Sequence, residues 1–307
     1  LRWLELEQYP WETSGGYLND LESLRRLTRL QHLRLTMESK VDDLKPLSNL
    51  VELRYLILTE CTNITDLGPL KDMDKLFLLE LDGCTNINDL AALQGMSSLK
   101  YLSLSGCRKA VVDLAPLHGL KTLTHLTLYK CGPVIDFGSL QDLPELKYLF
   151  IRECSGLSDL GFLLNIPSVK DLELSDCDAI TDIGPLHNLP NLVSVDLSQC
   201  EAITDLEPLR GLIKLDSLIL SGCGITDLEP ISSLDNLGSL DLFGCRGITD
   251  LNPLRGLRRL EMIILSYCEN LTDIGPLRDV SSLQDVYLVG CESIEPIPNV
   301  QVFYAYP

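Results

Sequence analysis

Apolar and polar residues alternate in short segments that recur at nearly constant spacing along the chain. Each segment has the form apolar-x-x-apolar-x-apolar-x-x-Cys, as in the run from Leu53 to Cys61 and again in the run from Leu192 to Cys200. The apolar-x-apolar part has a period of two, which is typical of a short strand with one buried face. The pattern therefore predicts many short strands of the same design.

The cysteines measure the period of this repeat. They fall at Cys61, Cys84, Cys107, Cys131, Cys154, Cys177, Cys200, Cys223, Cys245, Cys268 and Cys291, and successive spacings are 22 to 24 residues. Two earlier segments, which begin near Leu4 and Leu33, keep the frame without the cysteine. Repeats of this length stack as coils of a solenoid, and strands that recur in one direction pair in parallel. We expect about 13 coils.

A second segment, of the form I-x-D-[LI]-x-P-L or a close variant of it, follows every cysteine except Cys291, as from Ile64 to Leu70. Its Asp can accept a hydrogen bond from the N–H two residues on, and Pro is tolerated in a first helical turn. We expect short 3-10 or single-turn helices here, on the convex side. The aspartates are Asp43, Asp66, Asp89, Asp113, Asp136, Asp159, Asp182, Asp205, Asp227, Asp250 and Asp273.

The frame L-x-x-L-x-L-x-x-C resembles the leucine-rich-repeat signature, with Cys in the slot that accepts Asn or Cys. The segment after the cysteine resembles the repeats of the internalin family of bacterial surface proteins. It differs by one inserted residue, except at Cys223-Gly224-Ile225. Similar repeats occur at the C-terminal ends of bacterial NACHT-type (NLR-like) STAND ATPases and in kinetoplastid surface proteins.

This resemblance implies an α/β leucine-rich-repeat solenoid, a curved horseshoe with a parallel β-sheet on the concave face and short 3-10 or helical turns on the convex face. We predict one domain over residues 1–307. It divides into an irregular N-terminal coil over 1–37 with an insertion near 10–24, regular repeats over 38–295, and a capping strand over 296–307. The chain opens without an initiator Met or a signal peptide, so we expect upstream effector or ATPase domains of the same polypeptide.

Charge and cysteine usage narrow the partners and the compartment. The net charge of −19 argues against nucleic acid or an anionic membrane as partner, although 11 of the 44 acidic residues belong to the Asp ladder. No apolar run is long enough to span a membrane. A buried ladder of free thiols favours a reducing, cytoplasmic location, with the cell surface as the alternative. Calcium binding by the Asp ladder and metal or redox chemistry of the cysteines are the competing interpretations.

Catalytic patterns are missing from the sequence: no P-loop, GxSxG, GxGxxG or HExxH motif occurs. We therefore predict a protein that is not an enzyme and has no cofactor, catalytic residue or metal site. His118 and His187 take equivalent convex positions, where solvated surface residues are expected.

The positions that the frame leaves free are six, four, two and one residue before each cysteine, and these should face the concave side. Aromatic and Arg side chains there are typical of binding hot spots, although Tyr also suits a solvated sheet face. The candidate ligand-binding residues are Tyr55, Tyr101, His125, Tyr129, Lys130, Tyr148, Phe150, Arg152, Asp171, Glu173, Asp196, Phe243, Tyr267 and Tyr287.

The combined pattern predicts a non-catalytic module that recognises a protein, or another macromolecule, on its concave face. The resemblance implies the C-terminal sensor of a bacterial NLR-like defence or signalling protein. The alternative is the domain of an internalin-like surface adhesin.

Overall fold

A computed structural model describes residues 1–7, 20–36, 41–87, 89–109, 113–132, 136–291, 294–298 and 300–304. The chain forms two compact units, Leu1–Gly156 and Leu157–Pro307. Most of the insertion expected near residues 10–24 lies outside the described residues. A single domain over 1–307 stays a prediction.

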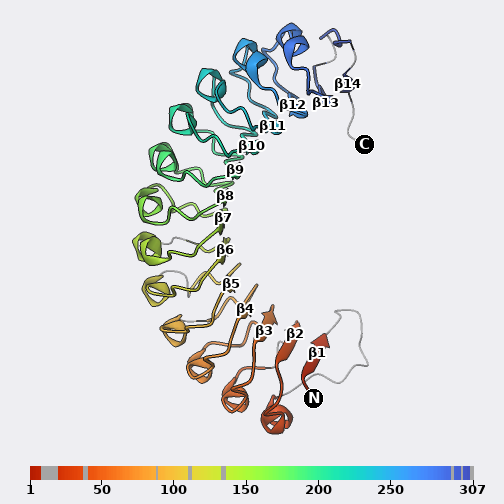
Figure 1. Cartoon of the computed structure of the whole chain (residues 1–307). Helices are drawn as coiled ribbons and strands as arrows, with labels where there is room; N and C mark the ends of the chain where they lie inside the picture. The colour runs from red at the N-terminus through yellow and green to blue at the C-terminus, as the bar shows by residue number, and fades with distance from the viewer. Residues whose placement is uncertain are drawn as a thin grey trace. The chain divides into compact units, whose positions relative to one another are not determined.

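The first unit contains a parallel sheet whose strands are ordered as in the sequence (Figure 1). Its strands are β1 (Trp3–Glu7), β2 (His32–Thr36), β3 (Tyr55–Thr59), β4 (Leu78–Glu80), β5 (Tyr101–Ser103), β6 (His125–Tyr129) and β7 (Tyr148–Arg152). Equivalent positions of successive repeats pair with one another, as Leu33 does with Leu56 and Leu126 with Leu149. This register places the inward leucines in continuous columns.

The second unit repeats the arrangement. Its strands are β8 (Asp171–Glu173), β9 (Ser194–Asp196), β10 (Ser217–Ile219), β11 (Ser239–Asp241), β12 (Met262–Ile264), β13 (Asp285–Tyr287) and β14 (Gln301–Phe303). All pair in parallel and in sequence order. The last strand, β14, lies in the segment expected to cap the repeat, and Val302 pairs with Val286.

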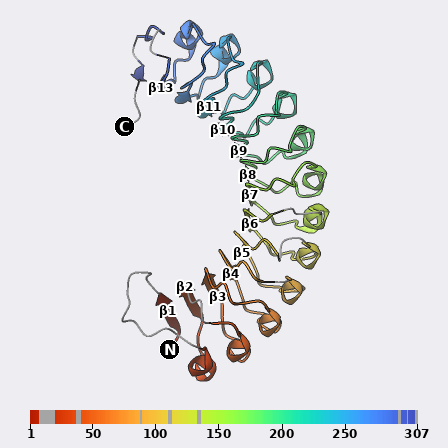
Figure 2. The same ribbon diagram turned by 180° about the vertical axis from the view of Figure 1, so that it is seen from behind.

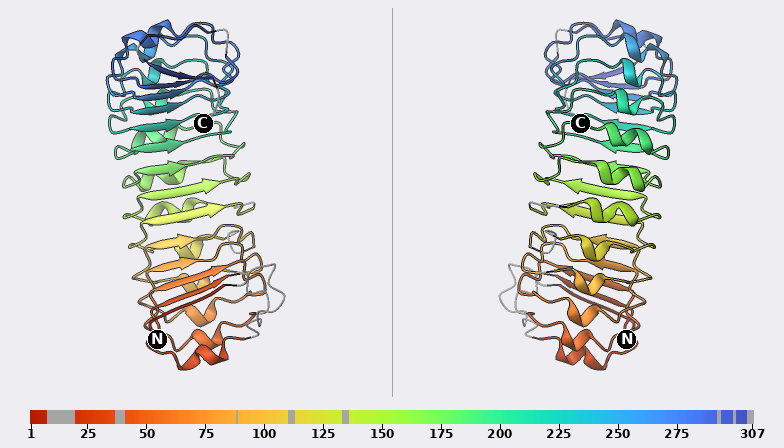
Figure 3. Two further views of the ribbon diagram at one scale, coloured as in Figure 1. Left: turned by 90° about the vertical axis from the view of Figure 1, so that its right-hand side faces the viewer. Right: turned by 90° about the vertical axis from the view of Figure 1, so that its left-hand side faces the viewer.

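Short 3-10 helices form the other side of each unit, as Figures 1 and 2 show from opposite directions. In the first unit they are η1 (Glu22–Arg26), η2 (Lys45–Leu47), η3 (Gly68–Leu70), η4 (Ala91–Leu93), η6 (Ala115–Leu117) and η7 (Gly138–Asp142). In the second they are η8 (Gly161–Asn165), η9 (Gly184–Asn188), η10 (Glu207–Leu209), η11 (Glu229–Ile231), η12 (Asn252–Gly256) and η13 (Gly275–Asp279). The left-hand view of Figure 3 looks onto the strands of each unit, with the helical turns behind them. The expected parallel sheet and short 3-10 turns are both confirmed.

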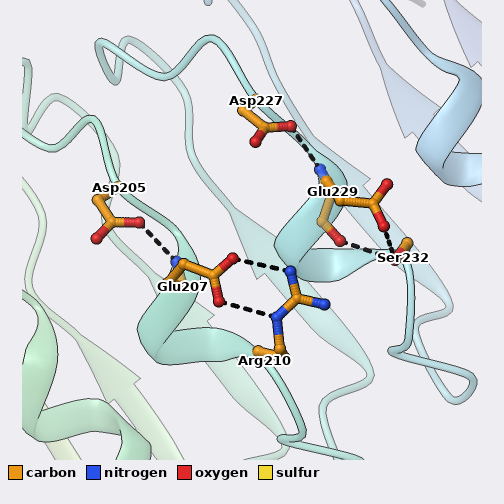
Figure 4. A network of polar contacts seen from close by, with 6 residues as sticks. All are labelled: Asp205, Glu207, Arg210, Asp227, Glu229 and Ser232. Carbon is orange, nitrogen blue, oxygen red and sulfur yellow. Dashed lines mark hydrogen bonds and ion pairs between the residues drawn. The ribbon is translucent and has the colours of Figure 1, made fainter.

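The Asp ladder caps these turns. In all eleven repeats the backbone N–H two residues after the Asp donates to its Oδ1 at 2.6 to 3.0 Å. Figure 4 shows two neighbouring caps, at Asp205 and Asp227. Asp20 makes the same contact with Glu22, so the caps begin two coils earlier than the cysteines do. Each cap satisfies an N–H that a short helix leaves without an internal partner.

The cysteines form a buried ladder beneath the strand ends, and all eleven are free and at most 6% exposed. Most thiols donate to the carbonyl of the last inward leucine of the preceding coil, as Cys107 does to Leu81 at 3.0 Å and Cys200 to Leu174 at 3.1 Å. Burial raises the pKa of Cys107 to about 12 and that of Cys200 to about 11. The slot therefore selects a small apolar side chain that can donate one weak hydrogen bond.

In the described part of the chain, no helix is long and apolar enough to cross a membrane. Within the same residues, no group of three or more His, Cys, Asp and Glu side chains is placed to hold a metal ion.

The thiols should react slowly in the native protein. Alkylation and disulfide exchange require the thiolate. All eleven thiols are buried, and burial raises the pKa of thiols such as Cys107 and Cys200. We expect a thiol reagent at pH 8 to label the folded protein slowly and to titrate about eleven thiols after denaturation. Fast labelling of the native state, or fewer than nine thiols after denaturation, would contradict a reduced and buried ladder.

Loss of one Asp cap should destabilise the fold measurably. Asp205→Ala removes the acceptor of the Glu207 N–H, and we expect a loss of about 1 kcal/mol in the free energy of unfolding. Arg210→Ala in the same turn is the matched control, because Arg210 only pairs with Glu207 at the exposed surface (Figure 4). Urea unfolding of both variants measures the difference. Equal midpoints would show that the cap does not stabilise the turn.

Candidate functional site

A row of seven rings lies along the strands of the first unit. It consists of Trp3, His32, Tyr55, Phe77, Tyr101, His125 and Tyr148. Centroids of neighbouring rings are 3.5 to 5.8 Å apart, so each ring contacts the next. Six of the seven rings, all but Phe77, occupy equivalent positions of their coils, and parallel pairing stacks such positions at the strand spacing. We call it the ring row.

The tightest part of the ring row is the stack of Tyr101, His125 and Tyr148. Their centroids are 4.0 and 4.1 Å apart, with interplanar angles of 23° and 13°. The Nδ1 of His125 lies 2.8 Å from the Thr124 hydroxyl. Burial, and to a smaller extent the charge of Lys147, lowers the pKa of His125. The imidazole is therefore held neutral near pH 7 and acts as a flat ring rather than as a cation.

A hollow of about 190 Å³ lies beside this stack. Its lining consists of Leu78, Leu79, Glu80, Tyr101, Leu102, Ser103, His125, Thr127 and Phe150. Glu80 carries the only carboxyl group in that lining. Its burial, and to a smaller extent the nearby charge of Asp82, raises the pKa of Glu80. Asp82 in turn accepts hydrogen bonds from the Ser103 hydroxyl and from the Ser105 N–H. The hollow thus combines aromatic walls with one desolvated acid.

Polar and charged groups meet at the far ends of β6 and β7. The Tyr129 hydroxyl donates to Glu153 Oε1 at 2.9 Å, and Lys130 Nζ lies 3.4 Å from Glu153 Oε2. Two cationic groups also lie over the Tyr129 ring. The Nζ of Lys130 is 4.8 Å and the Cζ of Arg152 is 5.7 Å from the ring centroid. We call this the Tyr129 cluster. Its contacts hold long side chains in place at the surface, which lowers the entropy lost if a partner binds there.

The structure separates the candidate residues into two groups. The eight from Tyr55 to Arg152 lie in the first unit, in the ring row, the hollow or the Tyr129 cluster. The other six, from Asp171 onward, lie in the second unit. There, Glu173 pairs directly with Asp196 across β8 and β9. Phe243 contacts Tyr267 at 5.1 Å between centroids, and Tyr287 stacks on Phe303 at 4.6 Å.

Several residues of the first unit escaped the sequence analysis. Trp3 and His32 occupy the same register position as Tyr55, and counting from the leucines instead of the cysteines would have found them. Phe77 had no such signal, because it lies one residue before the strand position that pairs with Tyr55.

One expectation about the concave positions is wrong. Ser175, Ser221 and Ser266, two residues before their cysteines, were expected to face solvent, but they are at most 9% exposed. The strands of these coils end before this position, and the chain already turns inward. Ser175 donates to Glu173 Oε1, and Ser266 accepts from the Val289 N–H. Small hydroxyls therefore serve the turn here rather than a ligand.

The sequence matches the family model described as "Leucine Rich repeats (2 copies)" at residues 167–211 and 213–256. The repeat frame, the parallel sheets and this match agree. The chain is a leucine-rich-repeat protein. A comparison with curated protein sequences finds no match.

Solved structures place this leucine-rich-repeat protein among known solenoids. The crystal structure of an internalin, InlF of Listeria monocytogenes, is 26% identical, with a TM-score of 0.78 over 92% of this chain and 88% of that one. A leucine-rich-repeat protein of Leptospira interrogans shares the fold at 18% identity, with a TM-score of 0.56 over 93% of each chain. TLR13, in the TLR13–ssRNA13 complex, matches at 22% identity and a TM-score of 0.68, over 91% of this chain and 44% of that chain.

The His125 stack should make stability depend on pH in a defined direction. The pKa of His125 is lower in the folded protein than in the unfolded chain. Just below pH 6.5, therefore, the folded protein binds fewer protons at this residue than the unfolded chain does. This contribution to stability is present above pH 6.5 and is lost as the pH falls through the folded pKa. His125→Phe keeps a ring between Tyr101 and Tyr148 but cannot titrate.

We expect His125→Phe to lose less stability than the wild type between pH 7.5 and 5, measured by urea unfolding at each pH. An NMR titration of the His125 ring should give a midpoint below 6.5 in the wild type. A midpoint above 6.5 would contradict a desolvated, neutral ring.

Proposed function

We propose that this protein recognises another protein through the strand face of the first unit. The observation that carries the proposal is the tight stack of Tyr101, His125 and Tyr148 beside the hollow that Phe150 lines. Leucine-rich-repeat folds are generally non-enzymatic binding scaffolds, and we propose a non-catalytic role here as well.

These side chains have no part in closing the repeat. The inward positions of β6 and β7 are Leu126, Leu128, Leu149 and Ile151, all fully buried. The outward residues, by contrast, are half-buried against one another and still reach solvent. Large rings that are held in one orientation bury much area at little entropic cost when a partner covers them. Binding hot spots are enriched in such side chains for this reason.

The chemistry favours a protein partner over a nucleic acid. The first unit contains 17 Lys and Arg against 21 Asp and Glu, a net charge of −4, and the whole chain carries −19. Nucleic-acid affinity depends on neutralising phosphates with an excess of basic residues. The likeness to TLR13 in its RNA complex is one of fold at 22% identity.

Within this general function, we propose that the chain is the sensor of a bacterial NLR-like signalling protein in the cytoplasm. Eleven free, buried thiols in one register suit a reducing compartment. The competing role is a surface adhesin, which the 26% identity with an internalin over 92% of this chain favours. The two roles share the same recognition surface.

Removal of two rings should abolish partner binding without unfolding the protein. Tyr148→Ala combined with Phe150→Ala opens both the stack and the hollow, and we expect a loss of at least about 2 kcal/mol in binding free energy, roughly 30-fold in Kd. The wild-type protein is used to capture partners from a cell lysate, and the captured partners are purified. Calorimetry then measures the Kd of the wild type and of the variant for each partner. The same variant should keep a cooperative urea transition.

The matched control is His118→Ala on the 3-10 side of the same unit. His118 is exposed and only pairs with Asp142 at 3.7 Å, so its loss should leave the Kd within two-fold. If His118→Ala weakens the purified partner while the double variant does not, the recognition surface lies on the other side.

The sequence of the complete gene would distinguish the NLR-like sensor from the surface adhesin. A sensor of the NLR type predicts a G-x-x-x-x-G-K-[ST] motif upstream in the same reading frame. A signal peptide together with a surface anchor would contradict the cytoplasmic sensor and favour the adhesin.

A further inference from the structure

The residue before each cysteine adopts a left-handed backbone conformation in every repeat. Its φ lies between +48° and +77° at all eleven positions. Five of these residues are glycines, which adopt positive φ without strain, and six are not. The frame therefore accepts either a side chain or none at this position. We call these residues the pre-cysteine positions.

A side chain at one pre-cysteine position covers the backbone of the next coil. The side-chain amide of Gln199 lies 3.0 Å from the point that a Cβ on Gly222 would occupy. In the same way, the Tyr267 ring lies 2.8 Å from the point that a Cβ on Gly290 would occupy. Gly222 and Gly244 are consecutive pre-cysteine positions, so two adjacent coils of the second unit lack a covering side chain. Nothing lies within 4 Å of the point where a Cβ on Gly244 would be.

The turn after the cysteine deepens this gap. Cys223-Gly224-Ile225 is shorter than the equivalent segment of every other repeat, by one residue in most of them. A Cβ on Gly224 or Gly247 would approach a backbone carbonyl to 2.5 Å, so neither residue can be replaced without a shift of the chain. The result is a hollow of about 550 Å³ in the second unit, within the size range of ligand sites.

The walls of this hollow are chemically specific. Its lining residues are Gln199, Glu201, Gly222, Cys223, Gly224, Phe243, Gly244, Arg246, Gly247 and Tyr267. The rings of Phe243 and Tyr267 meet at 59°, and Tyr267 is 44% exposed. Arg246 pairs with Glu269 at 3.2 Å, and Glu201 adds an acidic residue to the lining.

The second unit surrounds this hollow with negative charge. It contains 8 Lys and Arg against 23 Asp and Glu, a net charge of −15, compared with −4 in the first unit. Counted six, four, two and one residue before each of its cysteines, the unit has six acidic residues and no basic one. The six are Asp171, Glu173, Asp176, Asp196, Asp241 and Asp285. A field of this sign draws cationic groups towards the unit and repels anionic ones.

We propose that the hollow between Gln199 and Tyr267 receives an arginine or lysine side chain of a peptide or protein. The aromatic rings of Phe243 and Tyr267 attract a cation through their π faces, and the glycines leave room for its long stem. Glu201, which also lines the hollow, can supply a carboxylate for the cationic head. This site is separate from the ring row and does not depend on the function proposed above.

The test uses a fluorescently labelled tetra-arginine peptide, with tetra-glutamine as the uncharged probe, and measures anisotropy at 150 mM salt. Wild-type protein should bind tetra-arginine at least ten-fold more tightly than tetra-glutamine. Gly244→Gln fills the hollow, and its φ of +68° resembles that of Gln199 at +61°, so the frame accommodates the new side chain. Tyr267→Ala removes the exposed ring. Each variant should weaken tetra-arginine binding at least ten-fold.

Both substitutions leave the net charge unchanged, so attraction by the acidic field as a whole persists in them. Gly106→Gln is the matched control: it has the same backbone conformation, with φ of +76°, but lies in the first unit. It should bind tetra-arginine within two-fold of the wild type, as should the Tyr148→Ala, Phe150→Ala variant. Thermal melting confirms that each variant is folded.

Two results would overturn the proposal. Tetra-arginine binding that stays within two-fold in a folded Gly244→Gln variant would show that the acidic field, and not the hollow, holds the peptide. Equal affinity for tetra-glutamine would show that no cation is recognised. If Tyr267→Ala fails to fold, Gly244→Gln alone decides between these outcomes.

Discussion

Hydrogen bonding between successive coils is the constraint on which the rest of the structure depends. Within each unit, a short strand can satisfy its backbone groups only through the strands of the neighbouring coils, and these strands pair in register. This register stacks the leucines into columns and places most of the cysteines beneath a carbonyl of the preceding coil, as with Cys245 and Leu220 at 3.1 Å. A solenoid built this way gains stability from contacts between neighbouring coils.

Because the inward positions are committed to this stacking, the outward positions are free to carry different chemistry in the two units. In the first unit the first outward position of every strand except β4 carries an aromatic or imidazole ring, and parallel pairing turns these single rings into the ring row. In the second unit they are mainly acidic residues and serines, around a hollow with two aromatic walls. The same frame thus presents a flat ring surface in one unit and a strongly negative surface in the other.

The left-handed residue before each cysteine links the scaffold to its surface. The chain must turn sharply there so that the thiol can enter the core, and all eleven coils use the same positive φ. Glycine satisfies the backbone requirement but leaves the next coil uncovered, whereas Gln199 or Tyr267 satisfies it with some strain and covers that coil. A local choice between glycine and a side chain therefore decides where the surface is hollow.

The sequence by itself determined the strands, the 3-10 turns, the Asp caps, the buried thiols and most outward residues. All of these follow from a local frame that repeats, so the period in the sequence is also the period in space. Tertiary structure alone decided that Phe77 joins the ring row, that His125 is stacked between two tyrosines, and that Ser175 and Ser266 are buried. It also decided that Gly222 and Gly244 together open a hollow. Such features depend on which side chains meet across coils some 23 residues apart, and on where each strand ends, and the repeat pattern of a single coil does not contain that information.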